Sequence, residues 1–279
     1  KYSPQVIKNK LLIVPKIYDV PPIKLTGNSD FEVHVLVSRR DFPAMLWGLY
    51  SFYSFSSHDI GLVVHDDGSL DQSHRKKLET IFPGSNLIFR SESDLRMEQE
   101  LSSFPRSKKL RKTHATHLKI IDFFIFANRK KILFFDSDII FFESPEKILK
   151  EDKEENLFIE DVGTGYVLSI QEIASSFYLK VPPKINTGFG KIRKSCLDLE
   201  FLESCLSYEK LARGLFTTEQ TLIAMLAARG GGVETLGEEY KMKLEPGIEG
   251  KVIKHYVNII RYRLYTEGIP WVYENLMQK

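Results

Sequence analysis

Two carboxylates interrupt the most strongly apolar segment of the chain, in the stretch Ile132-Leu133-Phe134-Phe135-Asp136-Ser137-Asp138-Ile139-Ile140. The apolar residues before Asp136 predict a buried strand over Lys131–Phe135. In extended backbone, residues two apart point to one face about 7 Å from each other, so Asp136 and Asp138 are spaced to share a divalent ion. Because the apolar run resumes directly after Asp138, a mere surface turn is disfavoured: buried unpaired charge is costly.

Strands and helices alternate on the N-terminal side of this segment, which favours parallel pairing in a sheet covered on both faces. Ligands of such sheets collect at the carboxyl ends of strands, where Asp136 and Asp138 lie. Beyond Phe142 the alternation is less regular. Strands are predicted over Glu32–Val37, Ile60–Val64, Asn86–Phe89, Tyr166–Ser169 and Asn186–Lys191, and helices over Pro43–Phe55, Gln72–Phe82 after the cap Asp71, Lys109–Asn128, and around Cys196 and Thr218.

The predicted fold class is therefore α/β, with a Rossmann-like, mostly parallel sheet flanked by helices and merged with a mixed α+β C-terminal half. We expect one continuous fold divided at Phe142, into residues 31–142 and residues 143–279. Four prolines fall within residues 1–30. They predict an extended arm that wraps the domain.

The carboxylate pair indicates the chemistry of a site. Hard oxygen ligands favour Mn²⁺ or Mg²⁺, which proteins hold with one or two carboxylates together with substrate phosphates. Such an ion neutralises the charge that develops on a nucleoside-diphosphate leaving group. The pattern therefore predicts the cleavage of a sugar–phosphate bond.

Composition excludes some partners. The 279 residues are 43% apolar and 27% charged with a net charge of +2, so nothing indicates nucleic-acid binding. The one dense basic run, residues 106–112, is a solvated helix face or a contact for diphosphate or an anionic membrane surface. Only Cys196 and Cys205 occur, which predicts a reducing, cytoplasmic location, peripheral to a membrane if the basic run binds one.

Several stretches resemble, in order, the GT-A glycosyltransferases, most closely the glycogenin and lipopolysaccharide galactosyltransferase group (glycosyltransferase family 8). The D-x-D strand is residues 132–140, Ile185-Asn186-Thr187-Gly188-Phe189 is similar to the N-[ST]-G segment, and Thr218-Glu219-Gln220-Thr221-Leu222 is similar to the D-Q-x-x-[LF] helix start. Lys254-His255-Tyr256 resembles the late H-[FY] element. The match runs from about residue 31 to 258.

The resemblance implies a GT-A fold, residues 31–142 binding a nucleotide sugar, such as a UDP-sugar, and residues 143–279 binding the acceptor. His255 would complete the metal site of Asp136 and Asp138, and the order of motifs favours retention of anomeric configuration. Some positions depart from the pattern: Glu219 replaces the usual Asp, and only Asn258 and Pro270-Trp271 stand for the Gly and Lys-Pro-Trp that often follow the His.

Residues at strand ends are further candidates for donor binding. Val37 and Ser38 end the first predicted strand, and Asp67 follows the second, where base or ribose would bind. Ser137 lies inside the D-x-D motif, and Lys119, on the helix before it, is a candidate contact of the diphosphate.

The acceptor side is predicted around residues 186–188 and the helix that starts near Thr218. Asn186 and Gly188 would shape this side, and Gly188 allows close approach of backbone. Glu219 is the candidate base of an inverting reaction, whereas Gln220 would lie beside the anomeric carbon in a retaining one. Thr217 and Gln220 are also spaced as a capping box. No site is assigned to the basic-aromatic stretch Arg261–Tyr265 or to Trp271.

Other classes fit the same residues less well. The stretch His65–Ser69 is similar to the D-D-G-S turn of inverting family 2 transferases. A nucleotidyltransferase also uses carboxylates to hold a metal ion. A haloacid-dehalogenase-type phosphatase carries its D-x-D on the first strand, whereas the motif lies mid-chain here. A non-catalytic carbohydrate-binding protein has no need to keep a buried carboxylate pair.

Overall fold

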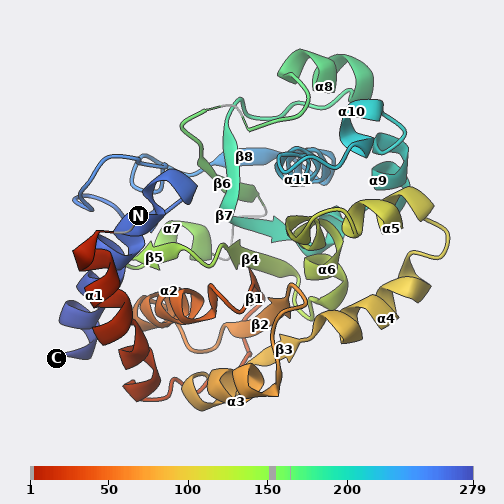
Figure 1. Cartoon of the computed structure of the whole chain (residues 1–279). Helices are drawn as coiled ribbons and strands as arrows, with labels where there is room; N and C mark the ends of the chain where they lie inside the picture. The colour runs from red at the N-terminus through yellow and green to blue at the C-terminus, as the bar shows by residue number, and fades with distance from the viewer. Residues whose placement is uncertain (1–2, 151–154, 164, 279) are drawn as a thin grey trace.

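The computed structural model describes residues 3–150, 155–163 and 165–278, and a seven-stranded sheet runs through the centre of this part of the chain (Figure 1). The strand order is β3-β2-β1-β4-β7-β6-β8, and β5 and β9 form a separate pair. The strands are β1 (Phe31–Val37), β2 (Gly61–Asp66), β3 (Asn86–Ile88), β4 (Lys131–Phe135), β5 (Ile139–Phe141), β6 (Asn156–Glu160), β7 (Ile185–Arg193), β8 (Val233–Thr235) and β9 (Ile253–His255).

The predicted parallel arrangement is confirmed. Strands β3, β2, β1 and β4 pair in parallel, β7 runs antiparallel to both β4 and β6, and β8 is parallel to β6. Only β7 therefore runs against the other described strands of the large sheet. Strand β4 lies in the middle, so the residues that follow it stand at the centre of the sheet's carboxyl edge.

Helices cover both faces of the sheet, because the strands bury side chains on both sides (Figure 1). Alternate residues of β4 show this: Leu133 and Phe135 pack in the core under α2, whereas Ile132 and Phe134 pack with α6 and α11. The longer helices are α1 (Pro4–Leu12), α2 (Phe42–Phe55), α3 (Gln72–Ile81), α4 (Arg90–Glu100), α5 (Pro105–Arg111), α6 (Leu118–Phe126), α8 (Ile170–Phe177), α9 (Leu199–Cys205) and α11 (Thr218–Arg229), and the short ones are α7 (Glu146–Leu149), α10 (Glu209–Ala212), α12 (Arg261–Arg263) and α13 (Ile269–Val272).

The extended arm predicted for residues 1–30 is wrong over its first part, which forms α1 and a 3₁₀ turn at Val14–Asp19. Proline is tolerated at the first position of a helix, where Pro4 stands, and the Ser3 hydroxyl accepts a hydrogen bond from the Val6 amide. The Asn9 side chain donates to the Tyr265 carbonyl at 2.7 Å, which fixes α1 against the C-terminal segment.

Two further expectations are corrected. The helix predicted over Lys109–Asn128 is broken at His114, which has extended backbone and accepts from the Thr116 amide, so that α5 and α6 are separate. The strand predicted over Tyr166–Ser169 is absent from the described backbone there, because the Val167 amide donates to the Thr221 hydroxyl and Ser169 caps α8.

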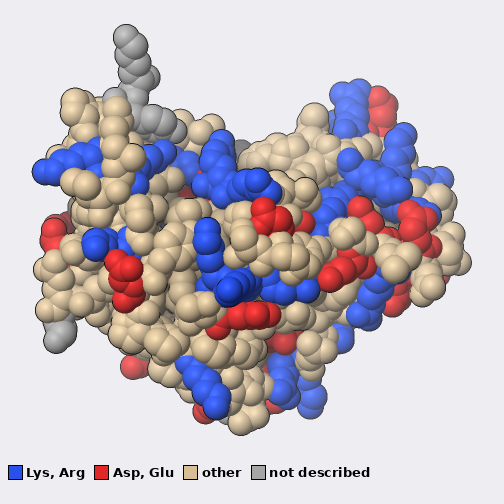
Figure 2. All heavy atoms as spheres, turned by 60° about the horizontal axis from the view of Figure 1, so that its bottom comes forward, with Lys and Arg blue, Asp and Glu red and all other residues tan. Residues whose placement is uncertain are grey.

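The basic run 106–112 lies on α5, and much of its charge is paired within the fold. Arg111 is buried against Asp122 and Asp94, and Lys108 and Lys112 both pair with Glu98. In Figure 2, positive and negative side chains are interspersed on the side where α4 and α5 lie. These partners favour a helix face with internal ion pairs over a membrane-binding patch.

Two other sequence-based expectations concern location. Cys196 and Cys205 are buried free thiols. Among the described residues, no helix combines the length and the apolar character needed to cross a membrane.

Candidate active site

The two carboxylates follow β4 in a tight turn. The Ile139 amide donates to the Asp136 carbonyl at 3.2 Å, so Asp136 and Asp138 are not in extended backbone as predicted. The turn still brings the carboxylates to one side, at the edge of the sheet. Asp138 is 5% exposed, so its carboxylate lies inside the fold and not in a solvated loop.

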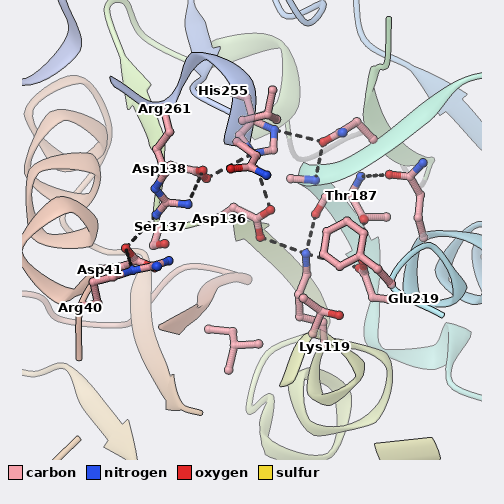
Figure 3. Close-up of a pocket in the computed structure, with 18 of the residues that line it drawn as sticks. Arg40, Asp41, Lys119, Asp136, Ser137, Asp138, Thr187, Glu219, His255 and Arg261 are labelled. Atoms are coloured by element: carbon pink, nitrogen blue, oxygen red, sulfur yellow. Dashed lines mark hydrogen bonds and ion pairs between the residues drawn. The ribbon is translucent and has the colours of Figure 1, made fainter. Parts of the chain in front are cut away.

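His255 joins the pair through the small sheet. Pairing of β5 with β9 places His255 opposite Ile139, and the Tyr256 amide donates to the Asp138 carbonyl at 2.9 Å. The His255 Nε2 atom lies 3.2 Å from Asp138 Oδ1 and 3.7 Å from Asp136 Oδ2 (Figure 3). Burial lowers the pKa of His255, but the two carboxylates outweigh burial and raise it above its usual value.

Asn186 holds the imidazole in this orientation. Its Oδ1 atom can only accept and lies 3.2 Å from His255 Nδ1, so Nδ1 carries the proton and Nε2 faces the carboxylates. The amide is itself fixed, because Nδ2 donates to Asp161 and Oδ1 also accepts from the Gly188 amide. Asn186, predicted on the acceptor side, therefore contacts His255, one of the candidate metal ligands.

Gly188 permits this packing. A Cβ atom at this position would collide with the His255 ring and with Asn186 Oδ1. The predicted close backbone approach is thus present, although it serves the histidine.

Lys119 is buried at the centre of the site and not exposed on its helix. Its ammonium donates to Asp136 Oδ1 at 3.0 Å and to the Thr187 carbonyl at 2.9 Å, and lies 3.3 Å from Glu219 Oε1. Burial lowers the pKa of Lys119, but the carboxylates of Asp136 and Glu219 raise it above its usual value, so the amine stays charged.

Glu219 and Gln220 reach the site from the first turn of α11. The Thr187 hydroxyl donates to Glu219 Oε2 at 3.0 Å, and the Thr187 amide donates to Gln220 Oε1 at 3.3 Å. Burial raises the pKa of Glu219 against the opposing effect of Lys119. The capping box predicted for Thr217 is wrong, because Thr217 has helical backbone and makes no capping bond.

Arg261 is a site residue that the sequence analysis did not assign. Its guanidinium bridges Asp138 Oδ2 and Asp41 Oδ1, each at 3.0 Å (Figure 3). Arg261 lies six residues after His255 in the sequence. This closeness to a candidate metal ligand was the only sequence feature that pointed to it. Burial raises the pKa of Asp138, but His255 and Arg261 together lower it below its usual value. Trp271, unlike Arg261, does not line the cavity and packs against Phe55 and Phe142.

The polar groups around Asp136 and Asp138 line one cavity of about 1120 Å³. Val37, Ser38 and Asp67 do not line it; among the described residues its border at the end of β1 consists of Leu36, Arg40 and Asp41. The Val37 carbonyl accepts from the Asp67 amide, and the Asp67 carboxylate accepts from Ser69. The lining includes Lys119, Asp136, Ser137, Asp138, Asn186, Thr187, Gly188, Glu219, Gln220, His255 and Arg261.

Three side chains of the site are suited to bind a divalent cation. Asp136, Asp138 and His255 each offer a ligand atom, and these atoms lie within 4.8 Å of one another. Two carboxylates with one imidazole match Mn²⁺, and a neutral His255 with its proton on Nδ1 offers Nε2 as the ligand atom.

Comparisons with known proteins bear on the fold. No protein-family model and no curated protein sequence matches the chain. Solved structures do. The galactosyltransferase LgtC, in complex with donor and acceptor sugar analogs, matches with a TM-score of 0.55 at 14% identity over 86% of this chain and 95% of that chain.

Two further structures agree. Mouse xyloside xylosyltransferase 1 matches with a TM-score of 0.53 at 10% identity, over 81% of this chain and 96% of that chain. The glycosyltransferase GlyE of Streptococcus pneumoniae matches with a TM-score of 0.53 at 13% identity, over 88% of this chain and 63% of that chain. The predicted GT-A glycosyltransferase fold is therefore confirmed.

Proposed function

We propose that the chain is a metal-dependent glycosyltransferase that moves a sugar from a nucleoside-diphosphate donor, a UDP-sugar, to a hydroxyl acceptor. One observation carries the proposal: Asp136, Asp138 and His255 converge at the carboxyl edge of a GT-A sheet, inside a cavity of about 1120 Å³. That is where ligands of open α/β sheets bind. A transferase of this fold, LgtC, has been solved with donor and acceptor sugar analogs.

Asp136, Asp138 and His255 would hold Mn²⁺ or Mg²⁺. The bound ion supplies positive charge to the diphosphate oxygens of the leaving group. Ser137 lies in the same turn and lines the cavity, so its place in donor binding is consistent with the geometry. The nucleoside is still proposed to contact Val37, Ser38 and Asp67. They do not line the cavity, although Val37 and Ser38 lie in sequence between Leu36 and Arg40, which do.

Two cations complement this centre. Arg261 lies on one side of the carboxylates and Lys119 on the other, and both line the cavity. A guanidinium binds phosphate with two parallel hydrogen bonds, so Arg261 is suited to bind the diphosphate. Lys119 pairs with the carboxylates of Asp136 and Glu219 and lines the same cavity.

In the transfer, the acceptor oxygen forms a bond to the anomeric carbon, the bond from that carbon to the phosphate oxygen breaks, and the acceptor proton passes to a base. Our preferred reaction retains the anomeric configuration, with Gln220 beside the anomeric carbon. One observation favours inversion as the second candidate: Glu219 lines the cavity with a raised pKa, which suits a general base. The anomeric configuration of the product, read by NMR, decides between them.

The test is nucleotide release from a panel of UDP- and GDP-sugars, with and without Mn²⁺. We expect slow, metal-dependent hydrolysis of one donor that falls by roughly a hundredfold or more in Asp136→Ala and Asp138→Ala, since the ion contributes several kcal/mol. Glu160→Gln is the control, because Glu160 ends β6 and pairs with Lys241 without lining the cavity. If no donor is hydrolysed and no donor with Mn²⁺ raises the melting temperature, the proposal fails.

A further inference from the structure

Phe216 is an exposed aromatic residue at the edge of the cavity. Its side chain is 67% exposed, although it lines the cavity beside Thr217. Of the large aromatic side chains that are exposed in the described part of the chain, only Phe216 and Tyr262 line the cavity, whereas Tyr178 does not. Single exposed apolar residues are common, so exposure alone decides nothing.

The loop that carries Phe216 is held in place. Gly214 has a φ of 61°, a conformation that favours glycine, and an added Cβ would come within 2.7 Å of Thr113 Oγ1. The His117 Nε2 atom lies 3.2 Å from the Leu215 carbonyl, and the Phe216 ring meets His114 edge-on at 5.6 Å. The chain therefore presents an apolar ring to solvent on a fixed loop, which favours ligand binding over packing.

The surroundings of the ring are polar. Phe216 lies two residues before α11, whose first turn brings Glu219 and Gln220 into the cavity, and Thr116 also lines the cavity. A ligand at this position therefore meets one flat apolar face together with hydroxyl, amide and carboxylate groups. A sugar ring has the matching shape, because its C–H groups form an apolar face and its hydroxyls radiate from the edge.

We propose that Phe216 is a stacking platform for the sugar ring of the acceptor, so that the acceptor is a glycan. This inference rests on the proposed function and names its acceptor class. A ring stacked on Phe216 has its hydroxyls beside the first turn of α11, where the predicted catalytic groups lie. A lipid acceptor would instead use the neighbouring Leu215, which is 53% exposed and does not line the cavity.

The experiment is saturation-transfer NMR on the full chain with UDP and Mg²⁺. The probes are methyl glycosides of glucose, galactose, mannose, xylose and N-acetylglucosamine, with anionic phospholipid vesicles and a Ser/Tyr peptide as the other acceptor classes. We expect at least one glycoside to bind. Its affinity should fall about tenfold in Phe216→Ala and in Phe216→Leu, which lacks an aromatic face, persist in Phe216→Trp, and be unchanged in Leu215→Ala.

The inference is overturned if glycoside affinity is equal in wild type and Phe216→Ala, if Leu215→Ala weakens binding as much, or if only vesicles or peptide bind. UDP affinity, measured by calorimetry in the same samples, separates the two proposals. Failure of UDP to bind contradicts the proposed function, whereas normal UDP binding with glycosides indifferent to Phe216 contradicts the platform alone.

Discussion

Arg261 donates from Nη1 to Oδ2 of Asp138 at 3.0 Å, which joins two residues 123 positions apart in the sequence. The same guanidinium lies 3.0 Å from Asp41, at the start of α2. The carboxylate of Asp138, a candidate metal ligand, is thus paired with a cation that lines the same cavity.

Arg261→Ala should weaken binding of UDP in the presence of Mn²⁺ by about thirtyfold, because a hydrogen bond to a charged group contributes about 2 kcal/mol. Calorimetric titration measures the affinity. Arg263→Ala is the matched control, since Arg263 lies two residues further and does not line the cavity. Equal losses in both variants would show a structural effect of the segment and contradict the assigned role.

Lys119→Met should destabilise the fold by about 3 kcal/mol, because it leaves the buried carboxylate of Glu219 without its cation. The pKa of Glu219 should rise further. Adding Glu219→Gln should restore most of the stability, as urea denaturation would measure. Lys254→Met, which breaks the buried pair with Glu267 elsewhere, is the control that Glu219→Gln should not rescue. Unchanged stability of Lys119→Met would exclude this pairing.

Gly188→Ala should lower Mn²⁺ affinity by roughly tenfold to a hundredfold, since the added Cβ displaces His255 and the Asn186 amide that orients it. The fold should persist, because the collision is with side chains. Gly163→Ala, with no atom close to the added Cβ, should leave Mn²⁺ affinity intact. A normal affinity in Gly188→Ala would remove His255 from the predicted ligand set.

The free energy of unfolding should decrease as the pH falls, because of the buried pair His34 and His65. Their Nδ1 and Nε2 atoms, respectively, lie 2.9 Å apart between β1 and β2. Burial lowers the pKa of both imidazoles, that of His65 the more strongly. The unfolded chain therefore binds more protons below about pH 6.5, and the free energy of unfolding decreases as the pH falls.

Between pH 7 and pH 5, wild type should lose about 2 kcal/mol more than His65→Phe. Urea denaturation at the two pH values measures this, and other histidines cancel in the difference. His58→Gln, at an exposed site outside the buried pair, should keep the wild-type dependence. Parallel pH profiles for wild type and His65→Phe would contradict the prediction.

Local patterns predicted the elements with the strongest periodicity. The apolar run of residues 132–135 is β4, Asp71 caps α3, and residues 186–191 lie within β7. The N-terminal helix was missed because four prolines favoured extended backbone. The role of Ser3 as the N-cap of α1 became apparent only in the folded chain. The break before α6 was missed because His114 replaces helical hydrogen bonds with its own side chain.

The sequence by itself determined the kind of fold and the position of the carboxylate pair, because buried strands and their polar ends leave a short-range pattern of apolar and charged residues. Only the tertiary structure decided which distant groups complete the site. Strand β9 places His255 beside Asp138, β7 places Asn186 behind the imidazole, and α12 carries Arg261 to the carboxylates. Such contacts depend on strand register and helix packing over long separations, to which no local periodicity is sensitive.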